Sequence, residues 1–154
     1  GGIARGERVV ERDGVPVAHV QPIEPAGQSR GFARRIRQQR LSGDILYVAS
    51  KNGIAAGPSN VAYGSIKAAQ AHQARLLAAE LGKDGVRVNC VTPGGVFNGH
   101  DERFTAEYGN RTPMGRMAEP EEIAHVAVFL ASGKASYVNG AIVTMDGAST
   151  PTVL

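Results

Sequence analysis

DILYVAS, residues 44–50, begins the part of the chain from which its architecture is most readily inferred. This apolar run predicts a strand that is buried on both faces. An alanine-rich segment follows at 61–82, VAYGSIKAAQAHQARLLAAELG, and predicts a long helix that ends near Gly82. VRVNCVTP at 86–93 predicts the next strand, which Pro93 ends because proline cannot donate to a strand ladder. Two strands joined through a helix predict a parallel pair.

The alternation of strand and helix continues on both sides of this stretch. VPVAHV (15–20) and AIVTMDG (141–147) predict two further strands, and RGFARRIRQQR (30–40) predicts an amphipathic helix. A last helix begins at Pro120, since proline is favoured in a first helical turn. Because strands that are apolar on both faces need cover on both sides, we expect an α/β fold. It would be a Rossmann-like, doubly wound parallel sheet with helices on both faces.

Each of the two later helices has an apolar stripe that we expect to be buried. In the long helix the stripe comprises Ala62, Ile66, Ala69, Gln73, Leu76, Leu77 and Leu81. In the helix after Pro120 it comprises Ile123, Val126, Ala127 and Leu130. Glu121 and Glu122 suit the positive end of that helix's dipole. The long stretch from Gly94 to Pro120 is predicted to cover the substrate and to hold a short helix at 102–109.

Length and composition fit one globular domain. The chain has 154 residues, of which 42% are hydrophobic and 20% are charged. No apolar stretch is long enough to span a bilayer and no signal-peptide pattern stands at the start, so we expect a cytoplasmic protein without a membrane partner. Cys90 is the single cysteine and lies in an apolar run, which predicts a buried thiol. His72 and His125 have no ligand-spaced partner, so no metal site is predicted.

The net charge of +3 raises the question of nucleic-acid binding. Five arginines lie within RGFARRIRQQR at 30–40. Phe32 and Ile36 stand four residues apart there, which indicates one apolar face and a solvated basic face. No aromatic interleaving or nucleic-acid motif accompanies the charge, so no nucleic-acid partner is predicted.

Tyr63 and Lys67 form a Y-x-x-x-K motif in the long helix. A spacing of four residues places the phenol and the ammonium on one helical face, and a nearby cation favours the ionised form of a phenol. The motif is common by chance, but Ser50 precedes it at the end of a predicted strand. There its hydroxyl can bond a substrate oxygen that the tyrosine protonates. Lys51 and Asn52 follow the serine and fit either a substrate contact or a turn.

The ordered set of motifs resembles the short-chain dehydrogenase/reductase family from about residue 43 to residue 150. Ser50, Tyr63 and Lys67 stand at that family's spacing for its serine, tyrosine and lysine. RVNCVTPGGVFN (87–98) is similar to the family segment R-V-N-x-x-x-P-G-x-V-x-T. Further similar segments are RTPMGRMAEPEEIA (111–124), FLAS (129–132), ASYVNG (135–140) and MDGA (145–148).

This resemblance implies an NAD(P)-dependent oxidoreductase that transfers a hydride between the cofactor and a small alcohol or ketone. Tyr63 would be the catalytic acid/base, Ser50 would polarise the substrate oxygen, and Lys67 would favour the phenolate and bind the nicotinamide ribose. The implied cofactor-binding residues are Gly2, Ile3, Tyr63, Lys67, Pro93, Gly94, Val96 and Asn98. Asn98 stands where the family usually has threonine. Helices of this family commonly pack across subunit interfaces, so a homodimer or homotetramer is also implied.

The N-terminal part departs from the family pattern. GGIARG at the start resembles only the end of the family's glycine-rich turn, with Gly2, Ile3 and Ala4 as its closing positions. ERVVERDG predicts a short helix before the strand at 15–20. That strand would be the second strand of a nucleotide-binding unit.

Several family features have no counterpart upstream of the serine strand. Gln21 stands at the position where an acidic residue would favour NAD, whereas an arginine nearby would favour NADP. The choice between the two cofactors therefore stays open. No asparagine precedes Asn52, and the catalytic asparagine of the family is therefore missing. We predict a single domain, 1–154, in which 1–29 is a remnant of the nucleotide-binding part and 30–154 is the catalytic part.

The abridged N-terminal half leaves two interpretations of the chain. Either the sequence records only parts of a longer protein, or the protein is a truncated or internally deleted product with a damaged nucleotide site. The leading hypothesis for function is the oxidoreductase. The alternative is a non-catalytic, oligomerising relative that lacks a complete cofactor site.

Overall fold

The computed structural model describes residues 8–12, 15–20, 27–39 and 42–150. Its strands are β1 (Arg8–Arg12), β2 (Val15–Val20), β3 (Gly43–Val48), β4 (Val86–Pro93) and β5 (Ile142–Met145). Its α-helices are α1 (Gly27–Gln39), α2 (Val61–Leu81), α3 (Glu102–Asn110) and α4 (Pro120–Leu130). Short 3-10 helices are η1 (Lys51–Gly53), η2 (Gly82–Asp84) and η3 (Gly133–Ala135).

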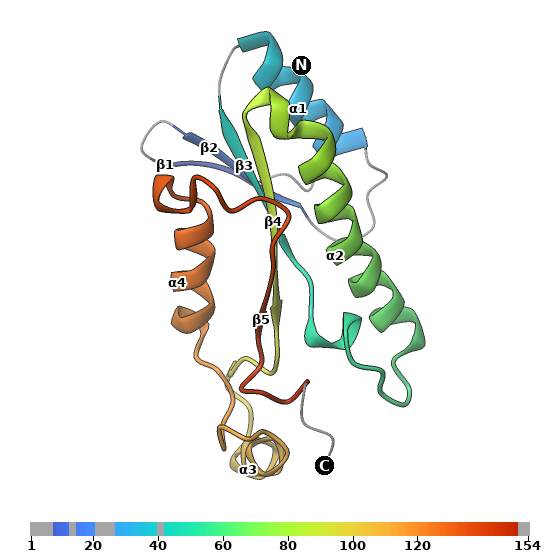
Figure 1. The fold of residues 1–154 in the computed structure, drawn as a ribbon. Helices are drawn as coiled ribbons and strands as arrows, with labels where there is room; N and C mark the ends of the chain where they lie inside the picture. Colours follow the sequence, from blue (N-terminus) through green and yellow to red (C-terminus); the bar gives the residue numbers. More distant parts are fainter. Residues whose placement is uncertain (1–7, 13–14, 21–26, 40–41, 151–154) are drawn as a thin grey trace.

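The described strands form one sheet in the order β1-β2-β3-β4-β5. The strands from β2 to β5 run parallel, because each connection between them passes through a helix, whereas β1 pairs antiparallel with β2. The helices α1 and α2 lie over one face of the sheet and α4 lies over the other (Figure 1). This arrangement confirms the predicted Rossmann-like α/β fold, to which β1 adds an antiparallel edge.

Alternate residues of β3 point into two separate cores. Ile45 and Tyr47 belong to a buried cluster with residues of α1 and α2, while Leu46 belongs to a second cluster with Leu130 of α4. Each fully buried side chain of this size contributes about 1.5–3 kcal/mol relative to an exposed one. Because helices cover both faces, the strand ends are the part of the sheet that remains open to a ligand.

The buried face of α2 is rotated from the predicted stripe. Leu77 and Leu81 are buried as expected. Leu76 is 56% exposed, and Ala62 and Ala69 are exposed too, so these three predictions are wrong. The other buried residues of the helix are Gln70, Ala74 and Ala78. Alanine occurs on nearly every side of α2, so the apolar periodicity is too weak to orient the helix.

The ends of α2 and α4 follow from local sequence. Gly82 caps α2 in a right-handed conformation, and the chain turns at Gly85, which has a φ of 74°. That positive φ is the conformation that favours glycine. The helix α4 begins at Pro120 as predicted, with a capping box between Glu119 and Glu122.

The prediction of a short helix within ERVVERDG is wrong, because Arg8–Arg12 form β1. The register pairs Arg12 with Val15, and the sequence between these two residues is Asp-Gly. Asp-Gly is a dipeptide typical of hairpins, and the β-branched pair Val9 and Val10 favours a strand. The pairing of β1 with β2 is therefore antiparallel and is not a strand–helix–strand unit.

Two predictions about exposure are confirmed. Ile36 of α1 is 2% exposed while Arg34, Arg35 and Arg37 are exposed, so the basic face of α1 is solvated. Cys90 is fully buried, and burial raises the pKa of its thiol to about 11. Within the described ranges, no helix is both long and apolar enough to cross a membrane. No group of metal-ligating side chains occurs among the same residues.

Candidate active site

The carboxyl ends of β3, β4 and β5 meet at one edge of the sheet, because these strands are parallel neighbours. Ser50 follows β3, Pro93 ends β4 and Asp146 follows β5. In open α/β sheets this edge is where ligands bind. The predicted serine therefore stands at the edge where sheets of this kind bind ligands.

Ser50 is nearly buried, with 9% of its surface exposed. It caps η1, and its hydroxyl oxygen accepts a hydrogen bond from the Asn52 amide at 3.2 Å. That bond does not use the hydroxyl hydrogen. The serine can therefore donate a hydrogen bond to a ligand oxygen while it keeps its place in the turn.

Two glycines let η1 lie directly against α2. A Cβ at Gly53 would stand 2.6 Å from the backbone nitrogen of Ala68. A Cβ at Gly64 would stand 2.8 Å from the carbonyl oxygen of Asn52. Both distances are shorter than van der Waals contact, so these positions need a residue without a side chain. The contact holds the segment after the serine against the helix that carries the Y-x-x-x-K motif.

Lys67 connects α2 to the end of β3. Its Nζ donates to the carbonyl oxygen of Val48 at 3.1 Å and lies 5.6 Å from the centre of the Tyr63 ring. Tyr63 is 47% exposed, so its side chain is open to a ligand. Because Val48 stands two residues before Ser50, the tyrosine–lysine pair and the serine are brought to the same strand end.

The residues after β4 form a tight turn against β5. The Gly94 amide donates to the Met145 carbonyl at 2.9 Å, and a Cβ at Gly94 would stand 2.9 Å from the Asp146 Cα. Val96 forms a parallel bridge with Ala118, in which the residues on either side of Val96 make the hydrogen bonds. Among the described residues, none bonds to the amide or the carbonyl of Val96. Both groups are therefore available to a ligand.

Asn98, a further predicted cofactor contact, lies two residues after Val96. The amide of Asn98, an exposed residue, donates to His100 Nδ1 at 3.2 Å, and the His100 ring stacks on Phe104 at 4.8 Å. Within the described part of the chain, no hydrogen bond fixes the Asn98 side chain. Gly2 and Ile3 lie outside the described residues, so their role in cofactor binding stays a prediction.

A cation and an aromatic ring lie beside the serine. Lys51 Nζ donates to Ser149 Oγ at 2.9 Å and lies 5.2 Å from the centre of the Tyr108 ring. The Tyr108 hydroxyl accepts a hydrogen bond from the Gly95 amide, and a Cβ at Gly95 would stand 2.7 Å from a ring carbon. Motif spacing did not identify this group, because its members come from four distant segments. The doubled glycine after Pro93 is the one local signal of a close approach.

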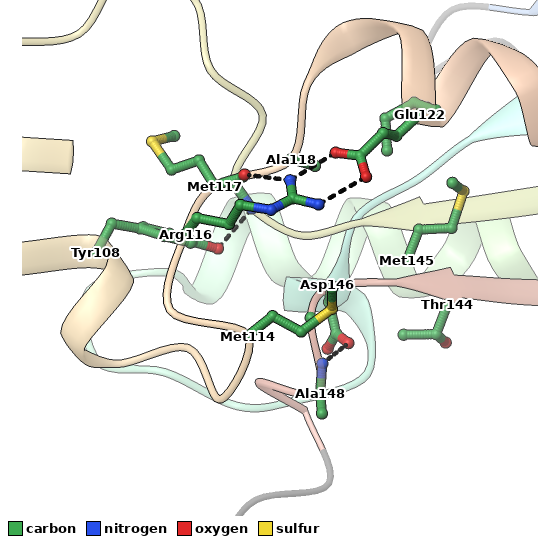
Figure 2. Close-up of a pocket in the computed structure, with 13 residues that line it drawn as sticks. Tyr108, Met114, Arg116, Met117, Ala118, Glu122, Thr144, Met145, Asp146 and Ala148 are labelled. Carbon is green, nitrogen blue, oxygen red and sulfur yellow. Dashed lines mark hydrogen bonds and ion pairs between the residues drawn. The ribbon is translucent and has the colours of Figure 1, made fainter. Parts of the chain in front are cut away.

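A cavity of about 300 Å³ adjoins this cluster. Its lining includes Gly95, Tyr108, Met114, Met117, Met145 and Asp146. Figure 2 shows the guanidinium of Arg116 facing the Glu122 carboxylate, with bonds of 2.7 and 2.8 Å. Hydrogen bonding to Arg116 lowers the pKa of Glu122 to about 2. These two charges neutralise each other, and the Asp146 carboxylate accepts hydrogen bonds from the amides of Ala148 and Thr150. The cavity therefore suits an uncharged part of a ligand.

The R-V-N segment stabilises the fold. Arg87 donates to the Leu130 carbonyl at 2.8 Å and pairs with Asp44 at 2.7 Å. Burial raises the pKa of Asp44, although the attraction of Arg87 opposes this shift. The Asn89 side chain bonds the backbone at both ends of residues 138–141. These contacts fix the chain just before β5 and so position the residues after that strand.

Comparisons with known proteins show to which family the chain belongs. Residues 26–150 match the protein family described as enoyl-(acyl carrier protein) reductase. A short-chain dehydrogenase from Leptospira borgpetersenii with bound NAD⁺ has a TM-score of 0.73 at 30% identity, over 80% of this chain and 50% of that one. The chain belongs to the short-chain dehydrogenase/reductase family.

Other short-chain dehydrogenases/reductases show the same partial match. Galactitol 2-dehydrogenase of Cereibacter sphaeroides is 38% identical over 97% of this chain and 63% of its own length. The structure of gluconate 5-dehydrogenase from Burkholderia cenocepacia with NADP and tartrate has a TM-score of 0.74 at 27% identity, over 81% of this chain and 51% of that one. The chain spans about half the length of most curated relatives that it matches.

Proposed function

We propose that the protein is an NAD(P)-dependent oxidoreductase that transfers a hydride between the cofactor and a small alcohol or carbonyl substrate. One observation carries the proposal. The Lys67 ammonium is held between the carbonyl oxygen of Val48 and the ring of Tyr63, at the strand end that bears Ser50. A phenol, a cation and a hydroxyl at one strand end are the groups that proton transfer to a substrate oxygen requires.

Each of these side chains has a task in the proposed reaction. The Ser50 hydroxyl donates a hydrogen bond to the substrate oxygen and orients it. The Tyr63 hydroxyl gives its proton to that oxygen when a carbonyl is reduced and takes it back when an alcohol is oxidised. Lys67 places its positive charge 5.6 Å from the centre of the phenol ring. A nicotinamide cofactor, when bound, would supply or accept the hydride at the substrate carbon.

The residues at this edge fit a nicotinamide cofactor. The available amide and carbonyl of Val96 match the carbonyl oxygen and the amino group of a carboxamide. The Lys67 ammonium, with hydrogens beyond the one donated to Val48, can also donate to ribose hydroxyls. Similar structures bind NAD⁺ or NADP, so both cofactors are candidates here.

Titration with NADH and NADPH tests this proposal. The fluorescence of each reduced cofactor reports its binding to the protein. We expect enhancement with at least one cofactor and its oxidation when a small ketone is added. No response to either cofactor would contradict the oxidoreductase and favour the second candidate, a non-catalytic relative. The reason to keep that candidate is that the chain spans about half of most relatives.

We further propose that the protein forms a homodimer or homotetramer through α2. The exposed side of this helix carries Val61, which is 83% exposed, and Leu76, which is 56% exposed. Exposed alanines, among them Ala68 and Ala69, lie on the same helix. Small residues permit the close approach of a second helix, and burial of the apolar side chains against that helix stabilises the assembly.

A further inference from the structure

Lys51 is a half-buried cation directly after Ser50, and no carboxylate pairs with it among the described residues. Its two described contacts are uncharged: the Ser149 hydroxyl at 2.9 Å and the Tyr108 ring at 5.2 Å. A partly buried charge without a counter-ion is unfavourable. An anionic group of a ligand would provide the missing counter-ion.

The surroundings hold the ammonium in one place. Ser149 Oγ, which accepts from Lys51, itself donates to the Asp146 carbonyl at 2.8 Å. The Tyr108 ring packs directly against Gly95, so a Cβ at Gly95 would overlap the ring. The ammonium is thus fixed between the ends of β3 and β5. Adjacent Cα atoms are about 3.8 Å apart, so its backbone lies next to that of the proposed substrate-binding serine.

We propose that Lys51 binds an anionic group of the substrate, a carboxylate or a phosphate, while Ser50 holds the reacting oxygen. The inference rests on the proposed oxidoreductase function and narrows its substrate to a short hydroxy acid or a phosphorylated alcohol. Ser149 and Tyr108 act as positioning residues, because they hold the ammonium and do not carry charge. The neighbouring cavity, with its paired Arg116 and Glu122, accepts the uncharged remainder of the substrate.

Steady-state kinetics with matched substrates test the charge requirement. Gluconate and glucitol 6-phosphate carry an anion, and glucitol does not. A hydrogen bond to a charged group corresponds to roughly a ten- to hundredfold change in affinity. We expect Lys51→Met to raise KM by this factor for an anionic substrate, to change kcat by less than about threefold, and to raise KM for glucitol by a clearly smaller factor. Lys51→Arg retains the charge and should restore most of the affinity.

Lys83→Met is the matched control, because Lys83 is an exposed lysine of η2 at the opposite end of the strands. It removes the same charge and should leave all three substrates unaffected. Equal losses with glucitol and with the anionic substrates in Lys51→Met would overturn the proposal. So would a wild-type protein that prefers glucitol.

Calorimetric titration with succinate and with inorganic phosphate, each with and without NADH, tests the anion subsite separately from the oxidoreductase activity. We expect at least one anion to bind the wild type and Lys83→Met, and to bind Lys51→Met at least tenfold more weakly. The preferred anion identifies a carboxylate or a phosphate as the natural group. Absence of turnover with every substrate would contradict the oxidoreductase, while the anion titration still decides the role of Lys51. If Lys51→Met binds both anions as tightly as the wild type does, the proposed anion subsite is refuted.

Discussion

Lys67 has two neighbours that explain its place in the site. The Val48 carbonyl fixes the ammonium by a hydrogen bond, and the Tyr63 ring lies 5.6 Å from it. A helical spacing of four predicts the second contact. The first depends on packing between α2 and β3, and it anchors the pair to the serine strand.

Replacing the phenol tests the proposed acid/base directly. We expect Tyr63→Phe to lower kcat by about 10²–10⁴-fold, because the hydroxyl that exchanges the proton is lost. Binding of the reduced cofactor, followed by its fluorescence, should persist. Tyr137→Phe is the control, since Tyr137 is fully exposed and outside the site. Turnover that survives in Tyr63→Phe would remove the basis of the proposed mechanism.

Cys90 provides an independent check on the core. Its thiol is fully buried and its pKa is raised to about 11, so little reactive thiolate forms below that pH. We expect iodoacetamide at pH 8 to leave the folded protein unmodified over an hour and to alkylate it fully in denaturant. Mass spectrometry measures both states. Rapid modification of the folded protein would show that the Cys90 thiol in β4 is accessible to the reagent and would contradict its burial.

The contact between η1 and α2 depends on glycine. We expect Gly53→Ala to lower the free energy of unfolding by about 1–3 kcal/mol and to reduce turnover, because the added Cβ overlaps the α2 backbone. Gly133→Ala is the matched control, since a Cβ there meets nothing within 4 Å. Urea unfolding and activity measure the two effects. Equal stability of the two variants would contradict the proposed packing.

The stability contributed by the first turn of α4 should depend on pH through Glu122. Its pKa is lowered to about 2 from an ordinary value of 4.5, so the contact with Arg116 is complete above pH 4.5. It is lost as the pH falls through about 2. We therefore expect Glu122→Gln to lower Tm at pH 7, with a difference from the wild type that shrinks as the pH falls from 4.5 towards 2.

Glu121→Gln provides the matched control for this pH dependence. Glu121 shares the first turn of α4, and none of the described ion pairs includes it. Thermal unfolding monitored by circular dichroism should therefore show a smaller shift in this variant. An equal shift in both variants would assign the effect to the helix dipole instead of the ion pair.

The exposed side of α2 bears on the assembly of the whole molecule. Light scattering should give two or four times the chain mass if α2 forms the proposed interface. We expect Leu76→Arg to weaken the assembly at least tenfold, because it would bury an unpaired charge. Ser136→Arg adds the same charge on an exposed residue of a different segment and should leave the assembly intact. A monomeric wild type would contradict this proposal.

Much of the architecture follows from local pattern. Runs that are apolar on both faces predicted strands at 44–50 and 86–93, which form β3 at Gly43–Val48 and β4 at Val86–Pro93. Pro120 correctly predicted the start of α4. The same reasoning placed Ser50, Tyr63 and Lys67 on elements whose ends meet at one edge. These inferences succeed because strand burial, helix capping and motif spacing depend on residues that are close in the chain.

Other features depend on contacts between distant segments. Local pattern could not orient α2, whose alanines make every side weakly apolar, and it assigned a helix where pairing with β2 forms a strand. It could not bring Lys51, Tyr108 and Ser149 together, because these residues stand on separate elements that only the packed sheet aligns. Short motifs therefore predict the proposed reaction chemistry, whereas the proposed anion subsite depends on parallel strands whose ends lie side by side.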